Sequence, residues 1–449
     1  MHYDVLDTST TIVAPATATG GAVMVVRISG DKAITIADKM FKGRTPLSEA
    51  KGYTLHYGNI VRPSGEIVDD VVVALFRTPH SYTGDDTVEI TLHGSEYITS
   101  ETLRLAIEHG ATMATPGEFT RRAFLAGKMD LSRAEAVADI IASDSKWSHH
   151  VASTQMRGGY SERLMELRSE LLRLCSLLEL ELDFSEEDVE FADRSELLLA
   201  LNTIENEIDS LCSSFSLGNT LKNGVNVAII GEPNVGKSTL LNTLIEDDRA
   251  MVSEIAGTTR DTIEASTIID GIRYRFVDTA GIHTTDDRLE QMGIDRSYRA
   301  MANAHIILHL ASVEHPEFEP IDINPNQRYI QVINKIDTST STSHTDDIVY
   351  ISAKHGVGID NLRRLLRDMT DTSQLGSGNI VVSNMRHYAA LKSAREALCD
   401  ARRAMRSSLP TDLISEDLRR VIHHLGEITG DITSDDILHT IFSKFCIGK

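Results

Sequence analysis

The chain has 449 residues, of which 41% are hydrophobic and 24% charged, and its formal net charge is −22. This length is too great for one compact core, so we expect two or three domains. The composition is that of an ordinary soluble globular protein. The negative charge argues against a protein that coats nucleic acid through a basic surface, although a local basic patch is still compatible with it.

The sequence shows no signal for export, membrane insertion or disulfide bonding. No apolar run approaches the length of a membrane span, and no basic stretch followed by an apolar stretch opens the chain. The four cysteines include no C-x-x-C pair, which argues against a disulfide framework or a zinc site. We therefore expect a cytoplasmic protein with no membrane association.

The first part of the chain predicts an α+β domain, which we place at residues 1–126. Apolar and polar residues alternate over residues 23–28, 53–61, 71–76 and 88–92, as they do in half-buried strands. Residues 99–109 have the spacing of a helix.

The pattern becomes helical from residue 127. Leucines or isoleucines recur at steps of three and four residues in two stripes, Leu164, Leu167, Leu171, Leu174 and Leu178, and then Leu198, Leu201, Ile204, Ile208 and Leu211. Two further stripes follow near the C-terminus: Leu391, Ala394, Leu398, Ala401 and Met405, and Ile414, Leu418, Val421, Leu425 and Ile428. The acidic residues 183–190 between the first two stripes are interpreted as a solvated turn, with a metal site as the alternative.

Between the helical parts, strand and helix signals alternate as in a doubly wound α/β domain. Residues 217–224 and 371–380 are rich in Gly, Asn, Ser or Thr and suggest its boundaries. We therefore predict a helical domain in two parts, residues 127–217 and 376–449, with an α/β domain at residues 218–375 inserted between them.

The inserted domain carries a phosphate-binding loop. An apolar strand at residues 225–230 runs into Gly231-Glu232-Pro233-Asn234-Val235-Gly236-Lys237-Ser238-Thr239, which is G-x-x-x-x-G-K-S/T in its strand–loop–helix context. Backbone N–H groups and the helix N-terminus favour phosphate there. We expect Lys237 to contact the β and γ phosphates and Ser238 to bind Mg²⁺.

Four further motifs follow in the order of a GTP-binding domain, and together they predict a Ras-like P-loop GTPase. Each motif occupies the place that such a domain requires: Thr258-Thr259-Arg260-Asp261 for a switch threonine, Asp278-Thr279-Ala280-Gly281 for Mg²⁺ and the γ-phosphate, Asn334-Lys335-Ile336-Asp337 for the guanine N1 and N2 groups, and Ser352-Ala353-Lys354 for guanine O6. Five ordered matches make ordinary loops a very poor explanation.

The residues after Gly281 indicate an unusual route to hydrolysis. Many small GTPases place a glutamine there to orient water, but this chain has Ile282. The phosphoryl group also needs a cation as charge develops on it. We therefore predict a monovalent cation held by Asn234 and the carbonyl groups of residues 253–258.

Taken together, these motifs and several runs elsewhere resemble the MnmE (TrmE) family of tRNA-modification GTPases over essentially the whole chain. The runs that carry the resemblance outside the five nucleotide motifs are Thr11-Ile12-Val13-Ala14, Arg27-Ile28-Ser29-Gly30, Ser81-Tyr82-Thr83-Gly84-Asp85-Asp86, Leu92-His93-Gly94, Pro116-Gly117-Glu118-Phe119-Thr120-Arg121-Arg122-Ala123-Phe124, Lys128-Met129-Asp130-Leu131, Ala134-Glu135-Ala136 and Cys446-Ile447-Gly448-Lys449.

The resemblance implies an N-terminal folate-binding domain and a helical domain that contains the inserted G domain. It also implies a homodimer formed through the N-terminal domain, and a heterotetramer with the flavoprotein MnmG. Together the two proteins of the family add an aminomethyl or carboxymethylaminomethyl group to carbon 5 of the wobble uridine of tRNA. The expected cofactors are Mg²⁺, K⁺ and 5-formyltetrahydrofolate or a related one-carbon folate.

The resemblance also implies roles for individual residues. Asn234, Ser253, Ile255 and Thr258 match K⁺ ligands, Ser238 and Thr259 match Mg²⁺ ligands, and Glu290 matches the water-positioning glutamate. The full set expected to bind GTP is Asn234, Val235, Gly236, Lys237, Ser238, Thr239, Ser253, Glu254, Ile255, Ala256, Gly257, Thr258, Thr259, Asp278, Thr279, Ala280, Gly281, Asn334, Lys335, Asp337, Ser352, Ala353 and Lys354.

For the folate, Arg27, Glu89, Lys128 and Lys449 match family contacts, and Cys446 matches a cysteine required for the modification. Without the resemblance, Glu290 and these charged residues would be read as surface groups.

Two departures from the family pattern are the Ala18-Thr19-Gly20-Gly21 loop and His283, which stands where an arginine is usual. The alternatives are a regulatory GTPase of ribosome assembly and a folate-binding scaffold.

Overall fold

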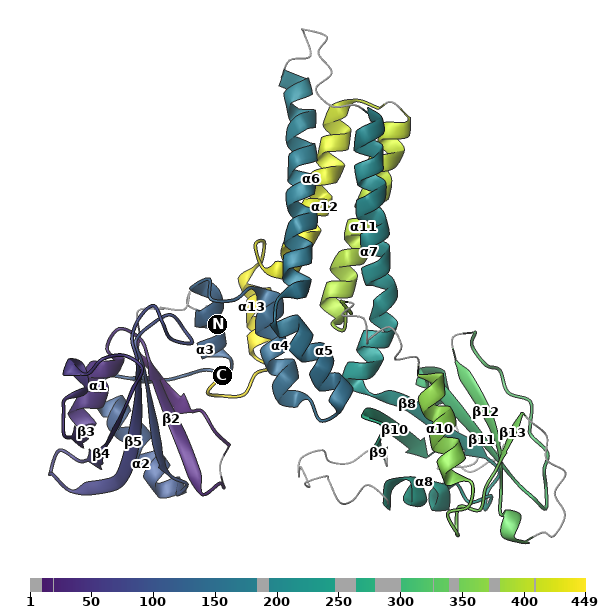
Figure 1. Cartoon of the computed structure of the whole chain (residues 1–449), viewed down its shortest axis with the longest axis horizontal. Coiled ribbons are helices and arrows are strands. Elements are labelled where there is room, and N and C mark those ends of the chain that lie inside the picture. The colour runs from purple at the N-terminus through teal and green to yellow at the C-terminus, as the bar shows by residue number, and fades with distance from the viewer. Residues whose placement is uncertain are drawn as a thin grey trace, which may run out of the picture. The chain divides into compact units, whose positions relative to one another are not determined.

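The structure is a computed structural model of the whole chain, and it describes residues 10–18, 20–183, 194–246, 264–278, 300–325, 327–338, 347–370, 380–407 and 409–449 (Figure 1). The chain divides into two compact units. The first comprises Met1–Ala138, Gln155–Ala192 and Arg403–Lys449, and the second comprises Asp139–Thr154 and Asp193–Arg402.

The first unit begins with a seven-stranded sheet in the order β3-β4-β5-β6-β2-β1-β7. Its strands are β1 (Ile12–Pro15), β2 (Val23–Ser29), β3 (Phe41–Gly43), β4 (Thr54–Val61), β5 (Ile67–Phe76), β6 (Thr87–His93) and β7 (Thr112–Met113). Alternate residues such as Val71, Val73 and Leu75 point into one buried core, as the period of a strand requires. The helices α1 (Ala33–Met40) and α2 (Glu96–Glu108) cover that face (Figure 1).

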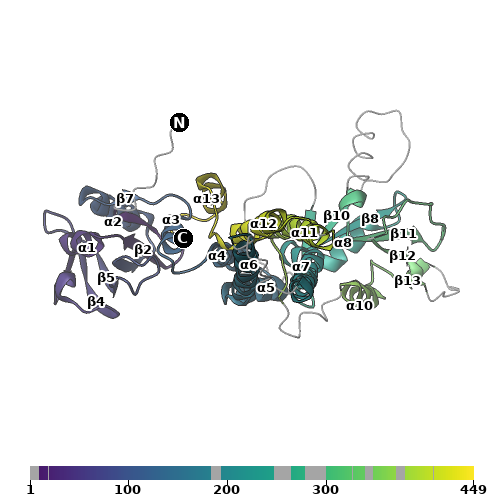
Figure 2. The ribbon, with the colours of Figure 1, turned by 90° about the horizontal axis from the view of Figure 1, so that it is seen from above.

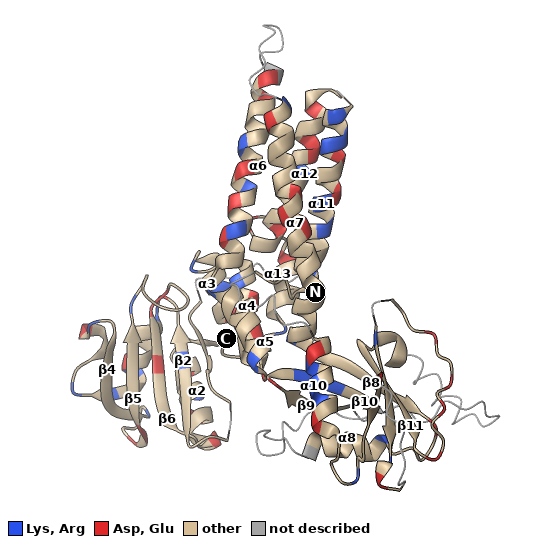
Figure 3. Cartoon of the chain, turned by 45° about the vertical axis from the view of Figure 1, so that its right-hand side comes forward, with Lys and Arg blue, Asp and Glu red and all other residues tan. Residues whose placement is uncertain are grey.

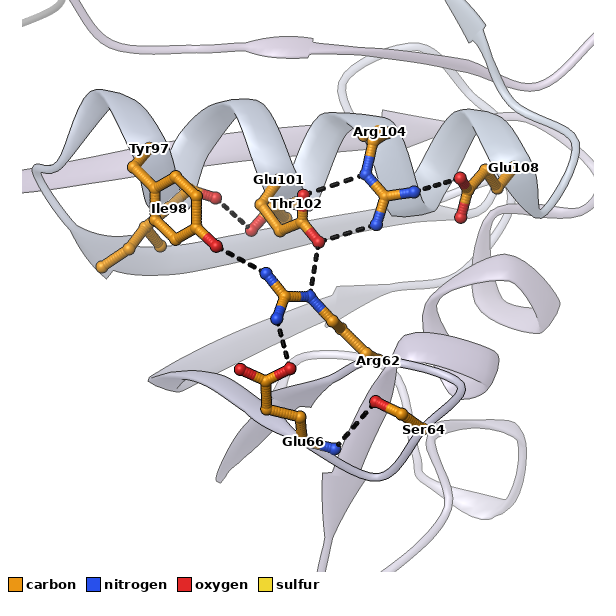
Figure 4. Close-up of polar contacts among 9 residues, drawn as sticks. All are labelled: Arg62, Ser64, Glu66, Tyr97, Ile98, Glu101, Thr102, Arg104 and Glu108. Carbon is orange, nitrogen blue, oxygen red and sulfur yellow. Dashed lines mark hydrogen bonds and ion pairs between the residues drawn. The ribbon is translucent and has the colours of Figure 1, made fainter.

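An ionic network fixes α2 to the loop between β4 and β5 (Figure 4). Arg62 donates through Nε to Glu101 Oε1 at 2.7 Å, and it also pairs with Glu66 and Tyr97. Arg104 donates to the same Glu101 carboxylate at 2.7 and 2.9 Å. Hydrogen bonds from Arg104 and Arg62 lower the pKa of Glu101 to about 2, so this carboxylate stays ionised when the domain is folded.

The helical part uses the predicted stripes as its packing surfaces. Its helices are α3 (Glu118–Leu125), α4 (Leu131–Ala142), α5 (Lys146–Met156), α6 (Gly159–Asp183), α7 (Arg194–Asn223), α11 (Met385–Arg406), α12 (Thr411–Thr429) and α13 (Asp435–Phe442). In the first unit α6 packs against α12. In the second unit α7 is tied to α11 by the pairs Glu205–Arg402 and Asp209–Arg395.

The predicted stripes are buried with one exception. In α7 the buried leucine is Leu197, whereas the predicted Leu198 is only partly covered. The helix also runs through residues 217–223, where composition suggests a boundary, and it ends before Gly224, whose φ is +93°. Gly218 lies inside the helix because the returning segment at Val382 packs directly on it. The acidic residues 184–190 lie outside the described part.

The second unit contains a six-stranded sheet in the order β13-β12-β11-β8-β10-β9, in which only the β9–β10 pair is antiparallel. Its elements are β8 (Val225–Gly231), α8 (Lys237–Glu246), β9 (Glu264–Ile269), β10 (Ile272–Asp278), β11 (Ile306–Ser312), β12 (Arg328–Asn334), β13 (Ile348–Tyr350) and α10 (Ile359–Met369) (Figure 2). The apolar faces of α8 and α10 share one core with this sheet. A separate cluster, in which Met301 and Ala304 join the alternate residues Ala228 and Ile230 of β8 and Ile307 of β11, lies outside that core, so both faces of the sheet are covered as the predicted α/β fold requires.

Candidate functional site

The phosphate-binding loop connects β8 to α8 at the carboxyl end of the central parallel strands. Gly231 and Gly236 have φ angles of +141° and +99°, and Asn234 has +62°. A Cβ at Gly231 would lie 2.1 Å from the carbonyl oxygen of Leu310 in β11, so only glycine fits there. The loop thus lies close against the sheet and leads into the N-terminus of α8. The N-terminus of a helix favours the binding of an anion.

Lys237 is the first residue of α8, and its side chain folds back over the loop. Its ammonium group donates to the carbonyl oxygens of Gly231 at 2.8 Å and Glu232 at 2.9 Å, and the residue is only 9% exposed. Ser238 and Thr239 follow in the first turn of the helix. The loop therefore presents a fixed positive charge next to hydroxyl groups, a donor set that fits a nucleotide phosphate with Mg²⁺.

Asn334 joins three of the predicted motifs. It ends β12 and is 2% exposed. Its Nδ2 donates to the carbonyl oxygen of Val235 in the phosphate loop at 2.8 Å, and its Oδ1 accepts from the backbone N–H of Ala353 at 2.9 Å. The phosphate loop and the two guanine motifs are therefore held in one assembly by a single buried amide.

The carboxylate of Asp337 is held ready to accept hydrogen bonds. Ser352 donates through its hydroxyl to Asp337 Oδ1 at 2.5 Å, and this bond is the main reason that the pKa of Asp337 lies below its ordinary value. An ionised carboxylate accepts two N–H donors from the edge of guanine, whereas adenine offers no such pair. Lys335 has a φ angle of +65°, and Lys354 is exposed at the end of the second motif.

The structure describes only part of the predicted nucleotide site. Asp278 ends β10, where its backbone is paired in register with Ile229 of β8, next to the phosphate loop. The remaining predicted residues, Ser253, Glu254, Ile255, Ala256, Gly257, Thr258, Thr259, Thr279, Ala280, Gly281 and Glu290, lie outside the described residues. Within the described ranges, no group of three or more His, Cys, Asp and Glu side chains forms a metal site.

A second candidate site lies in the first unit, where the C-terminal tail meets the β-sheet. Arg27 on β2 and Glu89 on β6 face each other in register, and Arg27 Nε donates to Glu89 Oε1 at 2.8 Å. Arg27 also donates to the carbonyl oxygen of Gly448 at 3.3 Å. The predicted folate residues Arg27 and Glu89 therefore neutralise each other beside the tail, and a bound folate would exchange for part of this pairing.

Aromatic rings enclose the Arg27 guanidinium. Its carbon lies 5.4 Å from the ring centre of Tyr82 and 5.5 Å from that of Phe119. Neither ring is among the residues for which the sequence predicts a role, although both belong to runs that resemble the MnmE family. A carboxylate, a guanidinium and flat apolar rings suit a ring system with a polar edge, so the residues fit a pterin.

The other two predicted folate residues lie in the same unit. Lys128 donates through Nζ to the carbonyl oxygen of Pro79 at 2.6 Å and packs beside Gly84. Lys449 closes the tail with a backbone hydrogen bond to Cys446 at 3.3 Å. Arg27, Glu89 and the tail thus come together, while the ammonium of Lys128 is engaged with the 79–84 loop.

Cys446 is the exposed thiol of the chain's four cysteines. Burial raises the pKa of the thiols of Cys175, Cys212 and Cys399, and that makes them poor nucleophiles. The segment that carries Cys446 is held in place, because the backbone N–H of Gly117 donates to the Cys446 carbonyl oxygen and Phe445 is buried.

Comparison with known proteins matches both parts of the chain that carry these residues to one family. The profile of the MnmE helical domain matches residues 131–446, and that of the GTP-binding protein TrmE N-terminus matches residues 11–128. The tRNA modification GTPase MnmE of Cytophaga hutchinsonii is 47% identical over 98% of both chains. The protein of the same name from Parabacteroides distasonis is 48% identical over 98% of this chain and 100% of its own.

Among solved structures, Era from Aquifex aeolicus bound to GDP·AlF4⁻ is 28% identical over 38% of this chain and 65% of that chain, with a TM-score of 0.26. The whole-length sequence relatives are the stronger finding, because they span the N-terminal domain, the helices and the nucleotide motifs together. The arrangement of Gly231, Lys237, Asn334 and Asp337 agrees with the GTP-hydrolysing enzyme that these relatives indicate. On these grounds the chain belongs to the MnmE family of tRNA modification GTPases.

Proposed function

We propose that this enzyme is a K⁺-dependent GTP hydrolase that, with the flavoprotein MnmG, installs an aminomethyl or carboxymethylaminomethyl group at carbon 5 of the tRNA wobble uridine. The observation that carries the proposal is the exposed Cys446, which is held on a tail that contacts the Arg27–Glu89 pair. A GTPase of ribosome assembly has no need of such a site.

In the G domain, the proposed division of labour follows the order of the motifs. Lys237 holds the phosphates, Asp337 and a backbone N–H of the Ser352-Ala353-Lys354 motif select guanine, and Ser238 and Thr259 bind Mg²⁺. Asn234, Ser253, Ile255 and Thr258 hold K⁺, whose charge takes the place of an arginine finger. Ile282 stands where many GTPases have a glutamine, and its side chain cannot hydrogen-bond to the attacking water. Glu290 is therefore the residue that we propose positions this water.

GTP turnover in matched KCl and NaCl buffers tests the hydrolytic part of the proposal. We expect fast hydrolysis in KCl, slow hydrolysis in NaCl, and loss of the K⁺-dependent part in Glu290→Ala. Glu396→Ala is the matched control, because Glu396 is exposed on α11 and lies away from the nucleotide motifs. Equal rates in the two salts would contradict the K⁺ assignment, and a Glu290→Ala variant as fast as Glu396→Ala would contradict the role of Glu290.

For the one-carbon donor, we propose that the Arg27, Glu89, Lys128 and Lys449 side chains bind 5-formyltetrahydrofolate or a related folate. When bound, the folate supplies the carbon that enters the modification. Glu89 would accept hydrogen bonds from the amino-pyrimidine edge, Arg27 beside it would contact the same end of the folate, and Lys128 would bind a carboxylate. Support comes from the donor set and from the Tyr82 and Phe119 rings beside Arg27.

The first unit has a surface that suits the proposed homodimer. On β4 the side chains of Leu55 and Tyr57 are 72% and 70% exposed, and their cross-strand partners on β5 are Ala74 and Val72. This apolar strip lies on the face of the sheet opposite to the core formed with α1 and α2. Contiguous exposed apolar residues of this kind are typical of an interaction surface, and a second copy of the chain is the occupant that we propose.

A further inference from the structure

A cavity of about 180 Å³ with both polar and apolar lining lies within the second unit, where the helical segments join the G domain. Four parts of the chain line it: the end of α4 with α5, the end of α7, strand β10, and the segment that leads into α11. Its polar lining residues are Asp139, Ser143, Ser148, Lys222, Asn223, Arg273, Arg275 and Ser383. The cavity is several times the volume of one water molecule, which is about 30 Å³.

The charges around the cavity do not balance. Lys222 Nζ lies 2.7 Å from Asp139, and Arg273 is paired with Asp144. The side chain of Arg275 on β10 makes no hydrogen bond or ion pair with any described residue. Three cations and one carboxylate, Asp139, thus line a half-buried space, and Asp144 pairs with Arg273 beside it, so one positive charge stays uncompensated and costs free energy unless an anion joins it.

The crowding of positive charge also affects Arg273. Burial is the main cause that lowers its pKa, and the nearby Arg275 lowers it further. A bound anion would relieve both effects, because it would compensate the desolvated charges.

Ser383 provides a second, uncharged donor. It lines the cavity and is 2% exposed, and its hydroxyl oxygen has no hydrogen-bond partner among the described residues. The neighbouring polar groups are already engaged, since Ser143 donates to Ile140 at 2.6 Å and Asn223 donates to Asn219 at 2.6 Å. Buried hydroxyl groups without a partner are rare in folded proteins, and a small turn of this side chain would bring its hydroxyl to an acceptor in the cavity.

We propose that this cavity binds a phosphate group through Arg275 and Ser383, with Lys222 and Arg273 as flanking cations. A guanidinium binds two phosphate oxygens at once, and a serine hydroxyl donates to a third. The phosphate comes from an RNA backbone or from free inorganic phosphate. The RNA source rests on the proposed function, whereas the free-phosphate source does not.

Inorganic phosphate is the probe for the site itself. The full chain is loaded with Mg²⁺ and GDP, so that the nucleotide loop is occupied, and is titrated with phosphate at constant ionic strength by calorimetry. We expect a saturable site that weakens roughly tenfold or more in Arg275→Ala and less in Ser383→Ala. Arg364→Ala is the matched control, because Arg364 is an exposed arginine on α10 away from the cavity.

The RNA arm uses the same variants and compares the salt dependence of tRNA binding. If an RNA phosphate occupies the cavity, Arg275→Ala lowers the slope of log K against log salt by about 0.9, while Arg364→Ala leaves it unchanged. An unchanged slope with weakened phosphate binding assigns the cavity to free phosphate. Phosphate binding that is absent from the parent protein, or equal in Arg275→Ala and Arg364→Ala, overturns the proposal. Because MnmG is proposed to supply much of the tRNA contact, the tRNA titration is made with MnmG present. If the parent chain with MnmG binds no tRNA, that result counts against the proposed function, and the phosphate titration still decides whether the cavity is a phosphate site.

Discussion

At the scale of single residues, the nucleotide site depends on Asn334 more than a motif search suggests. The N-K-x-D motif is usually discussed for its carboxylate, which faces the base. Here the buried Asn334 amide bonds to Val235 on one side and Ala353 on the other, so it holds the phosphate and guanine halves of the site together. Its contribution is structural support of the pocket.

Replacement of Asn334 by alanine should therefore weaken GDP binding without unfolding the domain. Two hydrogen bonds worth about 1 kcal/mol each are lost, which corresponds to roughly thirtyfold weaker binding. Titration with a fluorescent GDP analogue measures the change. Asn324→Ala is the control, because Asn324 is exposed in the same domain. Equal affinity of the two variants would show that the Asn334 bridge is dispensable.

The sequence predicts residue types at the site better than it predicts their partners. Lys237 and Asp337 stand out because their motifs follow one another in a fixed order along the chain, whereas Arg27 is found only through the family resemblance. The Arg27–Glu89 pair and the rings of Tyr82 and Phe119 depend on strand register and on the returning tail. Contacts across 62 or 421 residues, such as those of Arg27 with Glu89 and Gly448, leave no local signal in one sequence.

At the scale of elements, the N-terminal sheet shows how polar networks position helices. Periodicity predicts the strands β2, β4, β5 and β6 and most of α2, because alternation and helical spacing are local properties. The Arg62–Glu101–Arg104 network is not local, and it has a measurable consequence (Figure 4).

The network should make the stability of the protein sensitive to acid. The pKa of Glu101 is about 2 in the folded protein, whereas its ordinary value is 4.5. The contribution of this network to the free energy of unfolding is therefore fully present above about pH 5, and it is lost as the pH falls toward 2. Urea unfolding of the parent protein and Glu101→Gln should differ at pH 7, and the difference should shrink through that window. Glu49→Gln, at an exposed glutamate of the same domain, should match the parent. A difference that is independent of pH would contradict this account.

The segment at Val382, which leads into α11, limits the size of the side chain that α7 can carry at residue 218. Glycine inside a helix normally costs about 1 kcal/mol relative to alanine, so Gly218→Ala would ordinarily stabilise the protein. Here a Cβ would lie 2.3 Å from the Val382 carbonyl oxygen, and overpacking of this kind costs about 1–3 kcal/mol. We expect Gly218→Ala to lower Tm. Gly159→Ala, at the open start of α6, should not lower it, and an equal or higher Tm in Gly218→Ala would refute the contact.

At the scale of the whole molecule, the net charge bears on RNA binding, and the exposed apolar surface bears on assembly. The net charge of −22 predicts weak intrinsic attraction for RNA, so MnmG is expected to supply much of the tRNA contact. Among the described residues, no helix combines the length and the apolarity needed to cross a membrane. Basic residues on β10 and α10 are local exceptions to the acidic balance (Figure 3).

The apolar strip on β4 leads to a prediction about assembly. Tyr57→Asp places a charge in the proposed dimer surface, so sedimentation should show a shift from dimer to monomer at micromolar concentration. Leu199→Asp is the control, because Leu199 is 68% exposed on α7 in the other unit. If Tyr57→Asp stays dimeric, the second copy binds elsewhere. If the parent protein is already monomeric, the homodimer proposal fails.

The most direct test of the central claim is mass analysis of wobble nucleosides in tRNA from cells that lack this protein. We predict that the aminomethyl or carboxymethylaminomethyl groups at carbon 5 of the wobble uridine disappear. They should return with the parent gene, and they should not return with Cys446→Ser even though that variant hydrolyses GTP normally. Unchanged wobble nucleosides in the deleted strain, particularly together with a defect in ribosome assembly, would contradict the account.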